Sequence, residues 1–212
     1  RQEERLANAA ASIYISSATD LARSGVLTLP EALRLAPNLQ VARVDARNYA
    51  ITARGFNSAF QNKLLVLIDG RSVYSPLFSG VFWDAQDVLI SDIERIEVIS
   101  GPGATIYGAN AVNGVINIIT KSAKDSQGGL VGAAGGDDLR TAGMRYGGTT
   151  RNGHYRVYAK AIDVDDTLNA PGGDTRTGFR RRQAGFRADW ELGGYGLRVS
   201  GDAYQGSLEQ AG

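Results

Sequence analysis

Cysteine and histidine, two residue types that carry much enzyme chemistry, are scarce in this 212-residue chain. It has no cysteine and a single histidine, His154, so it offers no thiolate zinc site, no cysteine nucleophile and no convincing serine–histidine relay. Gly101-Pro102-Gly103 has the small residues of a phosphate-binding loop but lacks the Gly-Lys-Ser/Thr ending that holds phosphate and magnesium. We therefore expect a protein that is not an enzyme and that carries no cofactor.

One group of aspartates has the oxygen ligands that calcium prefers. Asp163, Asp165, Asp166 and Asp174 form this group, but Leu168 occupies the position where a calcium loop needs glycine for its sharp turn. A solvated loop is the simpler interpretation. The formal net charge of +1, without an interleaved basic and aromatic pattern, gives no attraction to nucleic acid. We expect no resident metal and no nucleic-acid partner.

In the first half of the chain, the elements that would position a functional site form a compact domain of mixed α and β structure. Leu64–Ile68 is a continuous apolar run that ends at Asp69-Gly70, a strong hairpin signal, so it predicts a strand buried on both faces. A first strand is expected at residues 13–16. Residues 95–99 and 115–119 are rich in β-branched side chains, as strands are. The predicted sheet includes Leu64–Ile68 and residues 115–119.

Two short helices are predicted near the N-terminal end, and each begins with the spacing of a capping box. Ser17 and Asp20 form the first box, and Gly25 would end that helix in the left-handed conformation. Thr28 and Glu31 repeat the same spacing. The first half of the chain therefore predicts an α+β domain with a small mixed sheet.

After Ser122 the pattern changes to strict alternation of apolar and polar residues, which predicts half-buried antiparallel strands. In residues 186–192, apolar and charged residues alternate, so they would lie on opposite faces of a strand. The apolar residues are Phe186, Ala188, Trp190 and Leu192, and the charged residues are Arg187, Asp189 and Glu191. About five such strands fit within residues 128–206. An antiparallel sandwich with one apolar face would give the same alternation.

The connections between these strands favour a membrane barrel over a sandwich. Those at residues 151–153 and 193–195 are short, whereas residues 165–178 form a long polar connection. Short and long connections alternate in outer-membrane barrels, although residues 135–138 are short where a long loop is expected. No apolar run reaches the 18 residues of a transmembrane helix.

Several motifs in the first half occur in a characteristic order. They are Arg54-Gly55-Phe56, the LVLIDG run that ends at Gly70, IERIEV from Ile93, Gly101-Pro102, Tyr107-Gly108, and NGVINIITK from Asn113. With these motifs the chain resembles the plug domain of TonB-dependent outer-membrane receptors. The resemblance implies a plug domain over residues 1–122 and the first strands of a transmembrane β-barrel over residues 123–212. Since plugged barrels of this kind have 22 strands, we expect a truncated barrel here.

The resemblance also implies a function. We expect a receptor or transporter in the bacterial outer membrane, with its plug facing the barrel lumen and the periplasm. It would take up a bulky scarce nutrient, a ferric siderophore in the first place, with cobalamin or another chelate as alternatives. TonB would act through a segment that we do not identify in this chain. A ligand-binding signalling receptor without transport is the other possibility.

Site residues follow from the resemblance residue by residue. Residues 55–62 and 73–86 match plug segments that face the substrate, where aromatic rings would stack on a chelate or pack inside the plug instead. The candidate ligand-binding residues are Phe56, Asn57, Phe60, Tyr74, Phe78, Phe82 and Trp83.

Two arginines match positions near barrel carboxylates in similar plugs. Arg54 and Arg95 are therefore candidates for plug–barrel contacts, together with Glu94 and Glu97 of the same motif. Local ion pairs between Arg95 and either glutamate are the alternative. Ser100 stands where many relatives have an arginine before Gly-Pro, so one cationic contact is missing.

Overall fold

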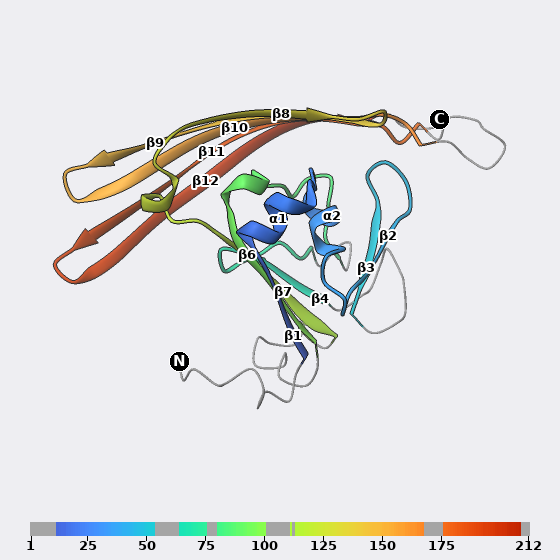
Figure 1. Cartoon of the computed structure of the whole chain (residues 1–212), viewed down its shortest axis with the longest axis horizontal. Helices are drawn as coiled ribbons and strands as arrows, with labels where there is room; N and C mark the ends of the chain where they lie inside the picture. The colour runs from blue at the N-terminus through green and yellow to red at the C-terminus, as the bar shows by residue number, and fades with distance from the viewer. Residues whose placement is uncertain are drawn as a thin grey trace. The chain divides into compact units, whose positions relative to one another are not determined.

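A computed structural model describes residues 12–53, 64–75, 80–100, 111, 113–167 and 176–208, and the chain divides into two compact units. The first unit comprises Arg1–Val44 and Asn48–Thr120, and the second comprises Asp45–Arg47 and Lys121–Gly212. Each unit is built around its own β-sheet (Figure 1). Among the described residues, no helix has the length and the apolar character needed to cross a bilayer.

The first unit contains a five-stranded mixed sheet with the order β1-β6-β7-β4-β5. Its strands are β1 (Ser12–Ser17), β4 (Leu64–Ile68), β5 (Arg71–Ser72), β6 (Ile93–Ser100) and β7 (Gly114–Thr120). β4 and β7 pair in parallel and the other neighbours pair antiparallel. β2 (Gln40–Arg43) and β3 (Tyr49–Thr52) form a separate two-stranded sheet. The predicted strands at residues 13–16, 64–68 and 115–119 are confirmed.

Helix α1 (Ala18–Ser24) begins and ends as its sequence predicts. The Asp20 backbone N–H donates to Ser17 Oγ at 3.3 Å, and the Ser17 backbone N–H donates to Asp20 Oδ2 at 2.9 Å. The two bonds satisfy backbone donors that the first helical turn would otherwise leave unpaired. Gly25 follows with φ of 69°, the left-handed conformation that glycine adopts without strain.

Helix α2 (Leu29–Leu33) forms without its predicted capping box. The Thr28 side chain makes no capping hydrogen bond, so that prediction is wrong. Glu31 instead pairs with Arg34 at 2.7 Å and accepts a hydrogen bond from the Tyr49 hydroxyl at 3.1 Å. Burial and the neighbouring Glu31 carboxylate raise the pKa of Tyr49 to about 12. One local partner, Arg34, and one distant partner, Tyr49, thus take the place of the predicted cap.

The turn between β4 and β5 is the hairpin that Asp69-Gly70 predicts. Both residues have positive φ, 50° for Asp69 and 85° for Gly70, as a two-residue type I′ turn requires. The Asp69 carboxylate accepts hydrogen bonds from the Thr120 backbone N–H at 2.9 Å and the Thr120 hydroxyl at 2.6 Å. The turn is thereby joined to the end of the neighbouring strand.

The core of the first unit lies on both faces of its central strands. On one face, Val66, Ile116 and Ile118 pack with helical residues that include Leu21 and Leu33. α1 and α2 lie over this face (Figure 1). On the other face a smaller cluster joins Leu65, Ala111 and Val115. Continuous apolar strands are the expected result of covering a sheet on both sides.

The second unit is a single curved antiparallel sheet of five strands (Figure 1). The strands are β8 (Gly128–Gly135), β9 (Leu139–Thr150), β10 (Gly153–Val164), β11 (Phe179–Leu192) and β12 (Tyr195–Leu208), and each pairs with its neighbour in sequence. The short 3₁₀ turn η4 (Lys124–Ser126) precedes β8. The predicted number of strands, the short turns and the long connection before β11 are confirmed.

Candidate functional site

The two faces of the β8–β12 sheet have the opposite polarity from the faces of a soluble sheet. Large apolar side chains on one face are between 46% and 86% exposed: Val131, Met144, Tyr146, Val157 and Phe186. Polar side chains on the other face are only 4% to 7% exposed: Arg156, Lys160, Arg181, Gln183 and Arg187. An apolar face of this extent marks a surface that meets lipid or another apolar partner. The alternation matches that of lipid-facing barrel strands, whose polar side chains are directed inward.

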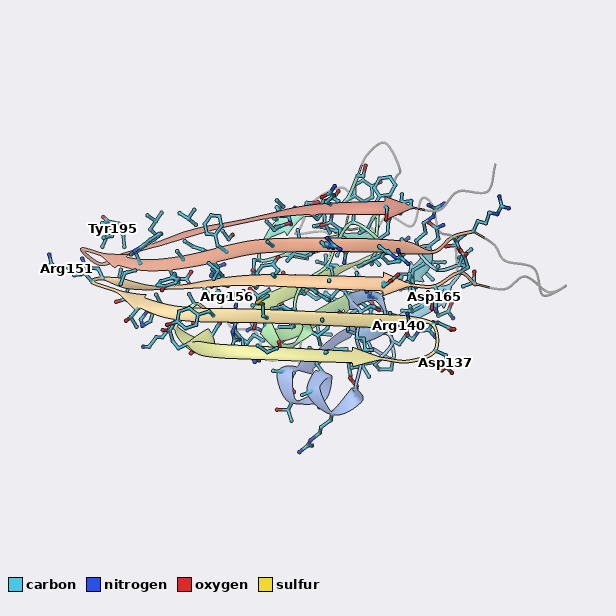
Figure 2. All side chains as sticks on the ribbon, turned by 90° about the horizontal axis from the view of Figure 1, so that it is seen from above. Asp137, Arg140, Arg151, Arg156, Asp165 and Tyr195 are labelled. Atoms are coloured by element: carbon cyan, nitrogen blue, oxygen red, sulfur yellow. The ribbon has the colours of Figure 1, made fainter. Side chains whose placement is uncertain are left out.

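The length of the exposed apolar face matches a bilayer. On β11 it lies between Arg182 at one boundary and Leu192 at its other end, ten residue steps that span ~33 Å along the strand. At the ~45° tilt of membrane strands this length covers ~23 Å across the bilayer, close to the ~25 Å apolar band of outer-membrane barrels. Figure 2 shows Arg151 and Tyr195 at one end of the sheet and Arg140 and Asp165 at the other. The apolar band thus ends in polar or interfacial residues on both sides.

The polar face of the sheet holds the segment that leads into β8. Arg156 on β10 donates from Nη1 to the Lys121 carbonyl at 2.8 Å and to Ser126 Oγ at 3.0 Å. Gly147 on β9 makes room for this segment, because a Cβ there would lie 2.1 Å from the Ser126 carbonyl oxygen. The start of the second unit is therefore fixed to the sheet by side-chain and steric contacts, in addition to its covalent continuity with β8.

A compact charge cluster lies beside this segment. Asp189 accepts the Ala123 backbone N–H at 2.7 Å, and Arg187 Nε lies 2.9 Å from the same carboxylate. Arg198 on β12 approaches Asp189 at 3.4 Å. Since the Arg187 side chain is almost fully buried, the nearby carboxylate offsets the cost of removing its charge from water.

Sequence reasoning did not identify this cluster as a site. Arg187 and Asp189 were assigned only to the polar side of an alternating strand. Gly147-Gly148 near the end of β9 was the available signal, because glycine inside a strand indicates the close approach of another backbone.

Arg95 in the first unit forms local ion pairs. Its Nη1 lies 2.5 Å from Glu94 Oε1 and its Nε lies 2.8 Å from Glu97 Oε1. Asn117 on β7 donates to the other oxygen of Glu97 at 2.9 Å. The hydrogen bond to Glu97 raises the pKa of the Arg95 guanidinium. The local alternative is present, whereas a contact of these residues with barrel carboxylates stays a prediction, and Arg54 lies outside the described residues.

The candidate ligand-binding aromatics fall into different environments. Tyr74 is half-buried and Phe82 is 44% exposed, whereas Trp83 is 7% exposed and belongs to the core. The backbones of Ser75 and Gly80 are joined by hydrogen bonds of 2.8 and 3.3 Å. Tyr74 and Phe82 therefore lie on the two chain segments that this pair connects, at the base of one loop. The remaining candidates lie outside the described residues: Phe56, Asn57, Phe60 and Phe78.

The described residues contain no group of three or more His, Asp or Glu side chains placed to hold a metal ion. His154 lines a cavity of about 930 Å³ in the second unit, together with Arg187 and Asp189. Arg187 and Asp189 form an ion pair there.

Comparisons with known proteins agree with this architecture. Residues 5–115 match the family model described as the TonB-dependent receptor plug domain. The chain is 35% identical over 142 residues to the vitamin B12 transporter BtuB of Vibrio vulnificus, covering 66% of this chain and 22% of that protein. It is 30% identical over 199 residues to BtuB of Vibrio cholerae, covering 92% and 31% respectively. The chain thus spans less than a third of these curated relatives.

Solved structures share the fold. The ferric enterobactin receptor PfeA of Pseudomonas aeruginosa, in complex with enterobactin, superposes with a TM-score of 0.65 at 24% identity, covering 91% of this chain and 32% of that one. The copper transporter OprC gives a TM-score of 0.69 at 15% identity, covering 93% and 31%. At these identities the likeness concerns the fold and not the substrate.

Proposed function

Since the chain belongs to the TonB-dependent receptors, we propose that it forms the plug and the first barrel strands of an outer-membrane receptor that imports a bulky metal chelate. The observation that carries this proposal is the inverted sheet, apolar outside and polar inside, which directly follows a plug-type domain. We place the plug at residues 1–122 and the barrel strands at residues 123–212. TonB, acting through a segment not identified in this chain, would pull on the plug from the periplasm with energy that comes from the inner membrane.

Cobalamin is the first substrate to test. The curated relatives at 30% and 35% identity are vitamin B12 transporters, which supports a large corrinoid chelate. A ferric siderophore is the second candidate, because the same plug architecture occurs in the enterobactin receptor. Both are rigid, partly apolar chelates that aromatic side chains can contact through their faces.

The loop that carries Tyr74 and Phe82 is the part of the described plug best suited to touch such a chelate. Phe82 keeps nearly half of its surface exposed although apolar residues surround it in sequence. Trp83 next to it is buried, so it would anchor the loop in the core and leave the contact to its neighbour. Function concentrated on a loop held by a rigid core is the usual arrangement of a binding site.

The test is equilibrium binding of cyanocobalamin and of a ferric catecholate siderophore to the full-length receptor, normalised to folded protein. Phe82→Ala is expected to weaken binding of the transported chelate by about 1–3 kcal/mol, the range of a binding hot spot. Ile15→Ala is the matched control, because Ile15 is 42% exposed and lies on β1. The control is expected to bind as the wild type does.

Two results would change the proposal. Unchanged affinity for both chelates in Phe82→Ala and Tyr74→Ala would reject this loop as the substrate site. Chelate binding without TonB-dependent accumulation in cells would favour the ligand-binding signalling receptor.

A further inference from the structure

One corner of the exposed face of the β8–β12 sheet is charged. Asp163 on β10 lies between Arg140 on β9 and Arg180 on β11, because the three residues are direct partners in the strand register. Arg182 lies two residues further along β11, opposite Ala161, on the same exposed face. Figure 2 shows Arg140 and Asp165 at this end, away from Arg151 and Tyr195. The corner adjoins the long connection between β10 and β11.

The charges of this corner are only partly balanced. Arg180 Nε donates to both oxygens of Asp163, at 3.0 and 3.1 Å. Arg140 Nη2 lies 4.0 Å from Asp165 Oδ2, with its side chain 70% exposed, so that pair is weak. Arg182 has no ion-pair partner within the described part of the chain. Three guanidinium groups therefore face two carboxylates, which leaves Arg182 without an ion pair and Arg140 only weakly paired, so both can contact an anion.

The surface at this corner is hollowed, and the hollow continues into the apolar band. A depression of about 590 Å³ is lined by Arg140, Asp163, Arg180 and Arg182 together with small residues. A neighbouring groove of about 700 Å³ has a mostly apolar lining. It shares Arg182 and three small residues with the depression. The shared small residues are Ala133, Ala142 and Ala161. A cationic hollow that opens into an apolar groove matches an anionic headgroup joined to an acyl chain.

The position of Arg182 sets the depth of this hollow in the bilayer. An arginine on the lipid face costs ~2–4 kcal/mol at the midplane but little near the interface. Arg182 therefore belongs at the boundary between hydrocarbon and headgroups, where lipid phosphates lie. Its long apolar stem can lie along the groove while the guanidinium reaches the phosphate layer.

We propose that this corner is a binding site for an anionic lipid, with an acyl chain in the alanine-lined groove and the headgroup phosphate between Arg140 and Arg182. The inference rests on the proposed function, because it requires the exposed face to lie in a membrane. Arginine suits this role because its planar group donates two parallel hydrogen bonds to a phosphate.

The experiment uses the full-length receptor in phosphatidylcholine nanodiscs that contain a small fraction of phosphatidylglycerol, with bound lipid counted by native mass spectrometry. Phosphatidylglycerol is expected to be retained preferentially. Affinity is expected to fall about 5-fold in Arg182→Gln and about 25-fold in Arg140→Gln/Arg182→Gln, at ~1 kcal/mol for each cation near a lipid surface. Arg151→Gln, an exposed arginine at the opposite end, is the matched control and is expected to change nothing.

A second variant separates a lipid site from a simple anion site. Ala161→Leu fills the groove and keeps every arginine, so it is expected to weaken phosphatidylglycerol retention. Displacement of the lipid by inorganic phosphate, or wild-type retention in Ala161→Leu, would reduce the corner to an anion site and overturn the proposal. Equal losses in Arg151→Gln and Arg182→Gln would also overturn it.

The same samples distinguish this inference from the proposed function. A receptor that inserts and binds its chelate without preferring phosphatidylglycerol would contradict only the lipid site. A protein that does not insert into nanodiscs would contradict the membrane assignment itself.

Discussion

β7 in the first unit and β11 in the second obey the same strand geometry but meet different surroundings. On β7, Val115, Ile116 and Ile118 are each fully buried, because other elements cover both faces of that sheet. On β11, Phe186 is about half exposed while the adjacent Arg187 is buried. Successive side chains point to opposite faces in both strands. The difference shows that the medium on each face, and not the strand itself, decides which residue types the sequence requires.

The two units are consequently stabilised in different ways. The first unit gains most from the burial of apolar side chains, which water drives. The second unit has a continuous hydrogen-bonded ladder, a polar face with ion pairs, and an apolar face that would be stabilised by lipid in the proposed membrane setting. The loss of stability caused by a substitution should therefore depend on the medium that surrounds the changed residue.

The largest effect is expected in the core of the first unit. Ile116→Ala removes a side chain with no exposed surface and should leave a cavity, so it is expected to destabilise the plug by about 2–5 kcal/mol. Chemical unfolding of the full-length receptor, followed by hydrogen exchange at the β4, β6 and β7 amides, would measure it. Val131→Ala is the control, because Val131 is the most exposed of the large apolar residues on the other sheet. Equal losses in the two variants would contradict the contrast between the units.

The second effect sharpens the lipid assignment. Val157→Arg places a charge in the middle of the apolar band and is expected to cost about 2–4 kcal/mol in a bilayer. Val157→Leu should be nearly neutral, because either side chain is apolar. The measurement is the free energy of unfolding from lipid vesicles. If the arginine variant were as stable as the leucine variant, Val157 would face water.

The third effect concerns the polar face. Asp189→Asn removes the charge that faces buried Arg187 and weakens the bond to the Ala123 backbone, so we expect a loss of about 1–3 kcal/mol. Glu191→Gln, an exposed change on the same strand, is the control. Hydrogen exchange at residues 121–127 should increase in Asp189→Asn alone. Unaltered protection there would show that the cluster does not hold the segment.

The smallest effect is the pH dependence of α1. Hydrogen bonds from the Ser17 side chain and backbone lower the pKa of Asp20 below its usual 3.8. Because the folded pKa is depressed, the capping contribution is present above the unfolded pKa and is lost as the pH falls through the folded one. The difference in α1 amide protection between wild type and Asp20→Asn should be constant near about pH 6 and shrink below about pH 4. A difference that grew on acidification would reverse the expected sign.

Local rules predicted much of the fold. The apolar run Leu64–Ile68, the turn at Asp69-Gly70 and the cap formed by Ser17 and Asp20 depend on residues that are close in sequence, and the structure confirms them. The capping box at Thr28 did not form, and Glu31 pairs instead with Arg34 and with Tyr49. The contact with Tyr49, 18 residues away, leaves no local pattern.

The site was less predictable. Alternation of Phe186 with Arg187 defines two faces, but a soluble sandwich alternates in the same way, so burial was needed to tell which face is covered. The contact of Arg156 with Lys121 and Ser126 joins residues 30 and 35 positions apart, a separation that periodicity does not encode. Trp83 shows the opposite case, because an aromatic in a substrate-facing motif lies in the core.

The most direct test of the account is an accessibility profile along β11. The chain has no cysteine of its own, so single cysteines placed in turn at residues 181–190 of a receptor otherwise free of cysteine can carry a spin label in lipid nanodiscs. Collision with oxygen, which concentrates in lipid, is expected to peak at residues 184 and 186 and to be low at 183, 185 and 187. A profile in which residue 186 instead collides with a water-soluble nickel chelate, or one without a period of two, would contradict the lipid-facing assignment of this sheet.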